Sequence, residues 1–350
     1  MLRISALTAG RFDPAARFRV RQYVSPLRRL GIDVAEMVPI LAKNATFPGV
    51  LGKVKPRFLG PLGLGLVGAR TLARLPGVIR NHAYGATWLQ RELISNFYSF
   101  EGVLKHPLIY DIDDAVWLRW SFADRIAKKA DVIIAGNRFL ADWGSQFCER
   151  VNVIPTAIDT ARFKPRKVMK RNKAFTIGWT GIRNNLKYLY DIESTLIMFL
   201  NKFSDARITV LCDKQPSFSG ISSNRVIYKK WSPAIETTVI NEFDVGIMPL
   251  RNGDWERGKC SFKMLQYMAS GIPVVASPVG MNADVFSMGC FGFPATTSSD
   301  WFDSLENIYI NRSKSKEYGM NGRDCIEKNF EVNKIAQRLA SVFHSVCLVS

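Results

Sequence analysis

The chain has 350 residues and a mass of 39.4 kDa, which is more than one hydrophobic core usually organises and favours two domains. Hydrophobic residues make up 47% of the chain and charged residues 22%, so intrinsic disorder and a single small binding module are excluded. The 48 Lys and Arg against 30 Asp and Glu give a charge of +18, which indicates a polyanionic partner: nucleic acid, acidic membrane or phosphorylated substrate. Fifteen of these cations and only four acids lie in residues 1–100, although a basic face that serves solubility alone is the alternative.

Cysteines and apolar runs indicate the compartment. The six cysteines include no CxxC pair and no zinc-ligand spacing, which favours reduced thiols over a disulfide scaffold or a metal cluster. The stretch MLRISALTAG is typical of an opening strand rather than of a signal peptide. The longest apolar run, residues 58–69, is broken by Pro61 and glycines, and a membrane-spanning helix needs about 20 residues. We therefore expect a cytoplasmic protein that can touch the inner face of a membrane without crossing it.

Short apolar runs alternate with longer helical patterns along the chain, which is typical of βα units and parallel sheets. In the first half the pattern predicts helices at Ala16–Leu30 and Asp124–Lys129, and strands at Arg3–Leu7, Asp33–Val38, Ala86–Leu89, Leu108–Ile112, Val132–Ala135 and Asn152–Ile154. In the second half it predicts strands at 175–179, 208–212, 226–231, 244–250, 273–277 and 290–293, and helices over the last 40 residues.

These elements predict the α/β class, with two Rossmann-like, doubly wound domains facing a cleft. The first domain is expected over residues 1–160 and the second over 174–330, joined by a basic, apolar-poor linker at 161–173. A C-terminal helix over 331–350 is expected to cross back. Such sheets bind ligands beyond the carboxyl ends of their strands, so the turns that follow the strands are the expected places for a site.

The strongest of these turns contains ERGKCSFKMLQYMASGIPVVASPVG, residues 256–280. A helix is predicted to begin near Ser261, so that the free N–H groups of Ser261, Phe262 and Lys263 form an anion site suited to a diphosphate. Ser261 can also cap this helix or donate to a ligand oxygen.

Two further side chains belong to the same turn. Lys259 adds a positive charge beside Lys263. Gln266 lies one helical turn beyond Phe262 and Lys263 on the same face, in reach of a nucleotide's sugar. A capped amphipathic helix with two solvated lysines is the alternative interpretation.

This segment resembles the donor-binding element of retaining glycosyltransferases of the GT-B fold, in the large family 4 that includes many bacterial polysaccharide and lipopolysaccharide transferases. The resemblance implies a nucleoside diphosphate sugar as the donor substrate and retention at the anomeric carbon. No cofactor is expected, and no divalent metal is required, because the lysines and arginines would supply its electrostatic role. The family usually has two glutamates eight residues apart. Here Gln266 stands at the second position and Gly258 at the first, and Glu256 is the nearest carboxylate.

A second turn follows the strand at 175–179. Gly181 turns the chain there, and Asn184 or Asn185 can cap the next helix. Arg183 and Lys187 resemble the family's diphosphate-binding basic pair, although a basic first helical turn is common without any ligand.

Asp113 and Asp114 follow the strand at 108–112, where their carboxylates would overlook the cleft. Adjacent acids can bind magnesium, orient a sugar hydroxyl or accept a proton, or they can only cap a helix. Many relatives have a histidine in this region, and none of the three histidines of this chain falls there. We expect Asp114 to lie nearest the reaction, with Asp113 beside it.

Four more residues follow strands of the first domain. Arg17 and Arg19 begin the first helix, where the resemblance implies contacts to donor phosphate or to the acceptor. Arg91 and Glu92 end another strand and are expected on the acceptor side.

The sequence thus predicts transfer of a sugar from a nucleoside diphosphate sugar to a hydroxyl of a glycan or lipid-linked acceptor. The segment 43–80 combines an apolar run with basic residues, which suits an anionic membrane surface, although a core helix and a solvated loop are the alternative. Those basic residues are Lys53, Lys55, Arg57, Arg70, Arg74 and Arg80. A catalytically inactive nucleotide-binding protein of the same fold and a basic nucleic-acid-binding protein are the rival functions. No nucleic-acid partner is expected, because no RNP, KH or zinc-finger pattern is recognisable.

Overall fold

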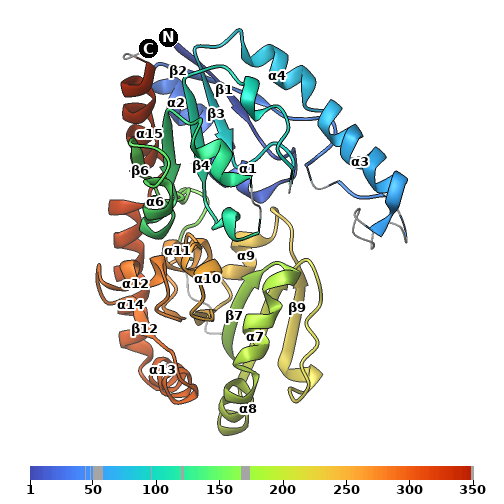
Figure 1. The fold of residues 1–350 in the computed structure, drawn as a ribbon. Coiled ribbons are helices and arrows are strands. Elements are labelled where there is room, and N and C mark those ends of the chain that lie inside the picture. The colour runs from blue at the N-terminus through green and yellow to red at the C-terminus, as the bar shows by residue number, and fades with distance from the viewer. Residues whose placement is uncertain are drawn as a thin grey trace. The chain divides into compact units, whose positions relative to one another are not determined.

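The computed structural model describes residues 1–43, 45–47, 49, 58–95, 97–119, 122–166 and 174–347. They form two compact units: unit 1 contains the chain up to Ala157 and again from Val332, and unit 2 contains Ile158–Glu331. Each unit carries one six-stranded parallel sheet with helices packed on it (Figure 1). The predicted α/β class with two doubly wound units is confirmed.

The sheet of unit 1 has the order β2-β1-β3-β4-β5-β6. Its strands are β1 (Leu2–Leu7), β2 (Ile32–Met37), β3 (Ala86–Gln90), β4 (Leu108–Ile112), β5 (Val132–Ala135) and β6 (Val151–Val153). Its helices are α1 (Pro14–Arg19), α2 (Val24–Arg29), α3 (Gly60–Leu72), α4 (Leu75–Asn81), α5 (Ala123–Ala127), α6 (Arg138–Gly144) and α15 (Val332–Cys347).

The sheet of unit 2 has the order β12-β11-β10-β7-β8-β9. Its strands are β7 (Phe175–Gly181), β8 (Ala206–Cys212), β9 (Val226–Lys230), β10 (Val245–Met248), β11 (Val274–Ala276) and β12 (Gly292–Pro294). Its helices are α7 (Leu186–Asp191), α8 (Glu193–Lys202), α9 (Glu236–Ile240), α10 (Asp254–Arg257), α11 (Phe262–Ala269), α12 (Met281–Phe286), α13 (Ser298–Ile310) and α14 (Arg312–Asn329).

The single helix predicted over Ala16–Leu30 is wrong. The segment forms α1, a 3₁₀ turn at Arg21–Tyr23 and α2. Pro26 explains the break, because proline has no N–H to bond to the carbonyl of residue 22 and fits only the first turn of a new helix.

The last helix, α15, completes the core of unit 1. Ile335, Leu339 and Phe343 lie in the same buried cluster as Ile4 and Trp88. The rings of Phe343 and Trp88 meet edge-on, with centroids 5.1 Å apart. The chain therefore returns to unit 1 at its end.

The boundary between the units falls slightly before the predicted one. Residues 158–166 lie in unit 2, where Phe163 is buried and its carbonyl accepts a hydrogen bond from Arg323. They are packed chain rather than the first part of the linker predicted at 161–173. Residues 167–173 lie outside the described residues.

Candidate functional site

Each sheet has one point where the strand order reverses. In unit 2, β7 pairs with β8 on one side and with β10 on the other. In unit 1, β1 lies between β2 and β3. Ligands of doubly wound sheets bind beyond the strand ends at these switch points. The turns after β7 and β10 and those after β1 and β3 are therefore the candidate site segments.

Ser261 immediately precedes α11 and has a strained backbone, with φ at +51°. Its side chain is buried, and its Oγ has no hydrogen-bond partner. Of the two predicted roles of Ser261, capping is therefore wrong, because its side chain makes no hydrogen bond to the N–H groups of the helix. A buried hydroxyl without a partner at a helix start is a group available to an anion.

Two lysines flank this helix start. The Nζ of Lys259 lies 5.2 Å from the ring centroid of Trp255, and the Nζ of Lys263 lies 5.9 Å from that of Trp179. Trp179 belongs to β7, so Lys263 joins the start of α11 to the end of the neighbouring strand. Phe262, the first residue of α11, is half-buried.

Tyr267 holds α11 against both central strands. Its ring packs on β10 at Gly246, where a Cβ would lie 2.3 Å from the ring and is excluded. Its hydroxyl oxygen accepts a hydrogen bond of 2.9 Å from the N–H of Thr180 at the end of β7. The helix start and the turn after β7 are thereby kept next to each other.

The side chain of Gln266, in the second turn of α11, is buried. Its Nε2 donates to Glu236 Oε1 over 3.1 Å, and Glu236 also accepts from Arg162 at 2.8 Å and from Trp231 Nε1 at 3.2 Å. The sequence reasoning missed Glu236, whose partners lie up to 74 residues away. This carboxylate fixes the direction of the Gln266 amide nitrogen.

The turn after β7 carries Gly181, Arg183 and Lys187. A Cβ at Gly181 would lie 2.4 Å from the Trp179 ring, so only glycine fits there. Arg183 is exposed and paired with Asp213 at 2.7 Å, and the Lys187 Nζ lies 4.7 Å from the ring centroid of Tyr188. Asn185 precedes α7 and makes no capping bond with its side chain, so capping by Asn185 is wrong.

Glu256 is the carboxylate nearest to the vacant glutamate position. It is buried in α10, and its Oε1 accepts a hydrogen bond from the hydroxyl of Tyr188 in α7. Tyr188 was not among the predicted site residues, because a tyrosine in an apolar helix pattern reads as core. The pair connects the turn after β10 to the turn after β7.

In unit 1, Arg91 brings together the two predicted aspartates. Its Nε lies 2.5 Å from Asp113 Oδ1 and its Nη2 lies 2.6 Å from Asp114 Oδ2. Arg91 follows β3 with φ at +59°, a conformation that L-residues avoid. Burial alone would raise the pKa of Asp113, but the Arg91 guanidinium holds it below its usual value. Asp113 thus stays ionised, and Arg91 fixes the direction of both carboxylates.

Glu92 and Lys43 form a buried ion pair of 2.8 Å beside this cluster. One carboxylate oxygen of Glu92, Oε1, therefore pairs with Lys43, whereas its other oxygen, Oε2, is buried without a hydrogen-bond partner. Gln90, directly before Arg91, is also buried, and neither of its amide atoms has a partner. Sequence reasoning missed Gln90 because it ends an otherwise apolar strand.

The expectation that Arg19 contacts donor phosphate or acceptor is wrong. Arg19 is 1% exposed, and its Nε pairs with Asp111 at 2.9 Å inside unit 1, where Trp88 Nε1 also donates to Asp111. Burial raises the pKa of Asp111 despite the charge of Arg19 beside it. Arg17 is half-buried, with its guanidinium carbon 4.6 Å from the ring centroid of Phe18.

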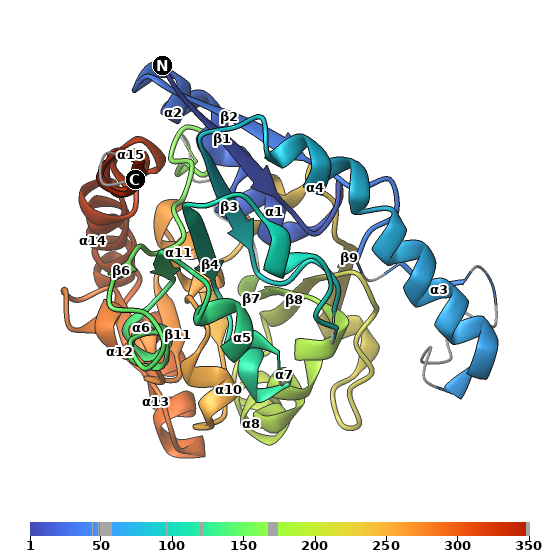
Figure 2. The ribbon, with the colours of Figure 1, turned by 45° about the horizontal axis from the view of Figure 1, so that its top comes forward.

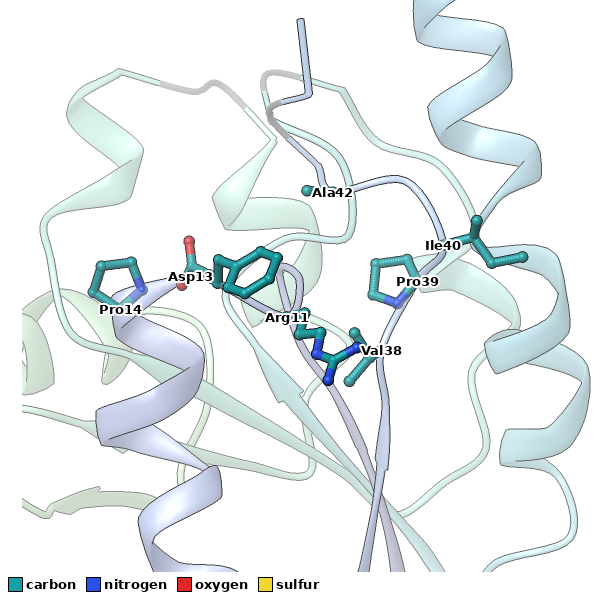
Figure 3. A pocket seen from close by; sticks show the side chains of 8 residues that line it. Arg11, Asp13, Pro14, Val38, Pro39, Ile40 and Ala42 are labelled. Atoms are coloured by element: carbon teal, nitrogen blue, oxygen red, sulfur yellow. The ribbon is translucent and has the colours of Figure 1, made fainter. Parts of the chain in front are cut away.

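A pocket of about 560 Å³ opens at the ends of β1 and β2 in unit 1. Figure 3 shows Asp13 and Pro14 at the start of α1, and Pro39 and Ile40 on the segment after β2. Its walls are mostly apolar, with Arg11 as the cation in its lining. Among the described residues, no three His, Cys, Asp or Glu side chains lie together as they would around a metal ion.

Comparisons with known proteins agree with this architecture. Residues 175–311 match the family model of glycosyl transferases group 1. Sucrose-phosphate synthase from Thermosynechococcus elongatus superposes with a TM-score of 0.71 at 13% identity, covering 100% of both chains. Anabaena HepE in complex with UDP-glucose superposes with 0.68 at 15% identity, covering 99% of this chain and 100% of its own.

The fold is GT-B. A third structure of this fold, from E. coli and bound with UDP-2-fluoro glucose, superposes with a TM-score of 0.62 at 12% identity, covering 97% of this chain and 98% of its own. Identities this low show a shared fold alone. No curated protein sequence matches the chain significantly. In this GT-B chain, the segment matched by the family model contains both turns of the unit 2 site, after β7 and after β10.

Proposed function

We propose that the protein is a glycosyltransferase that moves a sugar from a nucleoside diphosphate sugar to a hydroxyl of a glycan or lipid-linked acceptor. We further propose retention at the anomeric carbon and a role in cell-surface polysaccharide or lipopolysaccharide synthesis at the cytoplasmic face of a membrane. The observation that carries the proposal is the buried, unpartnered Ser261 hydroxyl at the start of α11, beside Lys259 and Lys263. The match of residues 175–311 to group 1 glycosyl transferases supports it.

On the donor side, the diphosphate would lie at the start of α11. Ser261 Oγ and the N–H groups of Phe262 and Lys263 would donate to its oxygens, and Lys259 and Lys263 would neutralise its charge. Negative charge grows on the diphosphate as the sugar leaves, so donors fixed before the reaction lower the barrier. Gly181 and Lys187 would border the phosphates from the turn after β7.

Two donor-side residues have partners that define their roles. Arg183 would reach a phosphate with the guanidinium that now pairs with Asp213. Gln266 would bind the ribose through its amide oxygen, since its nitrogen is held by Glu236. The HepE complexes contain UDP and UDP-glucose, and we propose the same nucleotide class for this chain.

On the acceptor side, Asp114 would accept a hydrogen bond from the attacking hydroxyl, with Asp113 and Arg91 fixing its direction. Because Arg91 holds Asp114 Oδ2, the carboxylate of Asp114 is fixed in direction and suited to accept a hydrogen bond from a hydroxyl. Arg17 and Glu92 Oε2 lie in the same unit, and the pocket at Arg11 would hold the apolar part of an acceptor. Fixed cations would take the place of a divalent metal, so turnover should persist in EDTA.

A thermal-shift panel of UDP, GDP, ADP and CMP tests the donor site. A ligand at 100 times its Kd raises the free energy of unfolding by about 2.7 kcal/mol. We expect one base to give a clear shift, and Lys263→Ala to reduce it. No shift with any of the four nucleotides would contradict the proposal.

A second measurement separates catalysis from binding. Release of the nucleoside diphosphate from the matching sugar nucleotide should be seen with wild type and be lost in Asp114→Asn. A nucleotide shift without turnover under any acceptor would favour an inactive binding protein of this fold, which the glycine at position 258 would explain.

A further inference from the structure

Helix α3 of unit 1 exposes apolar side chains and buries an arginine, which is the opposite of an ordinary surface helix. A surface helix buries its apolar residues and exposes its charges. In α3 the most exposed large side chains are leucines: Leu64 is 75% exposed, Leu72 63% and Leu62 60%. The exposed residues of α3 are Pro61, Leu62, Leu64, Gly65, Gly68, Ala69 and Leu72, together with Gly60 at its start. At 3.6 residues per turn these positions form one continuous face that carries no charge.

Two cations of this region, Arg70 and Arg74, point inward. Arg70 is buried and donates to the carbonyl of Ala45. Arg74, in the turn before α4, donates to the carbonyl of Thr8 over 2.5 Å, and burial lowers its pKa to about 10. Arg74 therefore fastens the junction of α3 and α4 to the end of β1, and Arg70 fastens α3 to the segment that follows β2. Of the basic residues that the sequence suggested for an anionic membrane surface, Arg70 and Arg74 are therefore buried instead, while Lys53, Lys55 and Arg57 lie outside the described residues.

Along the sequence, the segment that contains α3 carries charge of one sign. From Met37 to Arg91 the chain has no Asp or Glu, and it has eight Lys and Arg. Arg80, at the far end of α4, is exposed. An uncharged apolar face in a wholly basic segment complements an anionic lipid surface, which offers a negative headgroup layer above an apolar interior.

Length and anchoring indicate how α3 would meet a bilayer. The segment Gly60–Asn81 is apolar and long enough by composition to cross one. It is nevertheless two helices, and the 13 residues of α3 span about 20 Å, against about 30 Å of hydrocarbon. Arg74 ties the junction of α3 and α4 to β1. Figures 1 and 2 show α3 and α4 following each other along one side of unit 1, with α3 extending away from its sheet.

We propose that α3 is a membrane-docking helix that lies in the plane of an anionic bilayer, with Leu62, Leu64 and Leu72 inserted below the headgroups. The segment 38–40 connects this helix region to the acceptor pocket, since it lines both that pocket and a smaller one against Arg74 and Arg80. A lipid-linked acceptor would thus enter from the surface on which α3 lies; this last step rests on the proposed function, whereas the docking does not.

Co-sedimentation of the full chain with phosphatidylglycerol-containing vesicles and with pure phosphatidylcholine vesicles tests the docking. We expect binding to the anionic vesicles, weaker binding at high salt, and much weaker binding to phosphatidylcholine. The double variant L64E/L72E should lower the anionic-vesicle partition coefficient at least roughly tenfold. Ile310→Glu is the matched control, because Ile310 in unit 2 is 63% exposed, as Leu72 is, and its replacement should leave binding unchanged.

Three outcomes would overturn the docking: no binding of wild type to anionic vesicles, undiminished binding of L64E/L72E, or an equal loss in Ile310→Glu. A self-association of wild type that L64E/L72E abolishes, without vesicle binding, would assign α3 to a second copy instead. The nucleotide-induced thermal shift, measured on the same variants, should be unaffected. A missing shift with intact vesicle binding would contradict the donor site alone.

Discussion

Two residues, Arg91 and Ser261, have backbone conformations that residues other than glycine rarely adopt. They are the non-glycine residues with positive φ in the part of the chain that the structure describes. Such a conformation costs roughly 1–2 kcal/mol and persists where the surroundings impose it, most often at binding and catalytic sites. Arg91 follows β3, which lies beside the switch point of its sheet. Ser261 precedes α11, which comes after β10, a strand beside the switch point of the other sheet. Strain at these two positions supports a site in each unit.

Ser261→Ala should separate stability from binding. Removing a buried hydroxyl that has no partner should leave the free energy of unfolding unchanged or raise it by about 1 kcal/mol. The same change should weaken nucleoside diphosphate binding roughly tenfold, since a hydrogen bond to a charged phosphate is lost. Denaturant titration and nucleotide titration measure the two effects.

Ser270→Ala is the matched control at the other end of α11. The Ser270 hydroxyl is also buried without a partner, but it lies away from the helix start. Its replacement should change stability in the same direction and leave nucleotide affinity as in wild type. Equal weakening by both variants would mean that the loss comes from the helix as a whole rather than from the Ser261 hydroxyl.

The Arg91–Asp113 pair predicts a pH dependence. Since the folded pKa of Asp113 is held below its ordinary value of about 3.9, its contribution to stability is present above that pH and is lost as the pH falls through the folded pKa. Asp113→Asn should therefore cost about 1–2 kcal/mol at neutral pH, and the difference from wild type should shrink below about pH 4. A difference that stays constant down to pH 3 would show that the charge of Asp113 does not contribute.

Most strands were predictable because a parallel strand covered on both faces is a short, nearly continuous apolar run. Leu108–Ile112 and Val132–Ala135 have the predicted limits. Helix breaks and inward-facing cations were harder to predict. The direction of Arg19 depends on Asp111, which lies 92 residues later and reaches it only through the pairing of β3 with β4. A local pattern of basic residues after a strand cannot distinguish an arginine that points to a ligand from one that points into the core.

Helix α15 packs in the core of unit 1, so weakening its packing should lower the stability of unit 1 first. Phe343→Ala deletes a fully buried ring that packs against Trp88, and such changes cost about 3–5 kcal/mol. We expect hydrogen exchange to accelerate in β1 and β3 of unit 1. His344→Ala, an exposed neighbour on the same helix, should change stability by less than about 0.5 kcal/mol. Equal effects of the two variants would contradict the role of α15 as part of this core.

At the scale of the whole molecule, each unit has its own buried core, and the proposed donor contacts all lie in unit 2. A nucleoside diphosphate should therefore slow hydrogen exchange mainly in β7, β10 and α11, and leave the strands of unit 1 close to their unliganded rates. Exchange measured by mass spectrometry with and without the nucleotide tests this. Protection confined to unit 1 would move the donor site there.

The division of the chain also sets an order of events during its synthesis. The ribosome delivers the six strands of unit 1 first, then all of unit 2, and only afterwards the helix that covers Trp88. At about 5–20 residues per second, the face of the first sheet under α15 stays uncovered for roughly ten seconds or more while unit 2 is made. Until α15 has been made, the nascent protein therefore presents an apolar surface of its first-made half, and we expect chaperones to bind it during that interval.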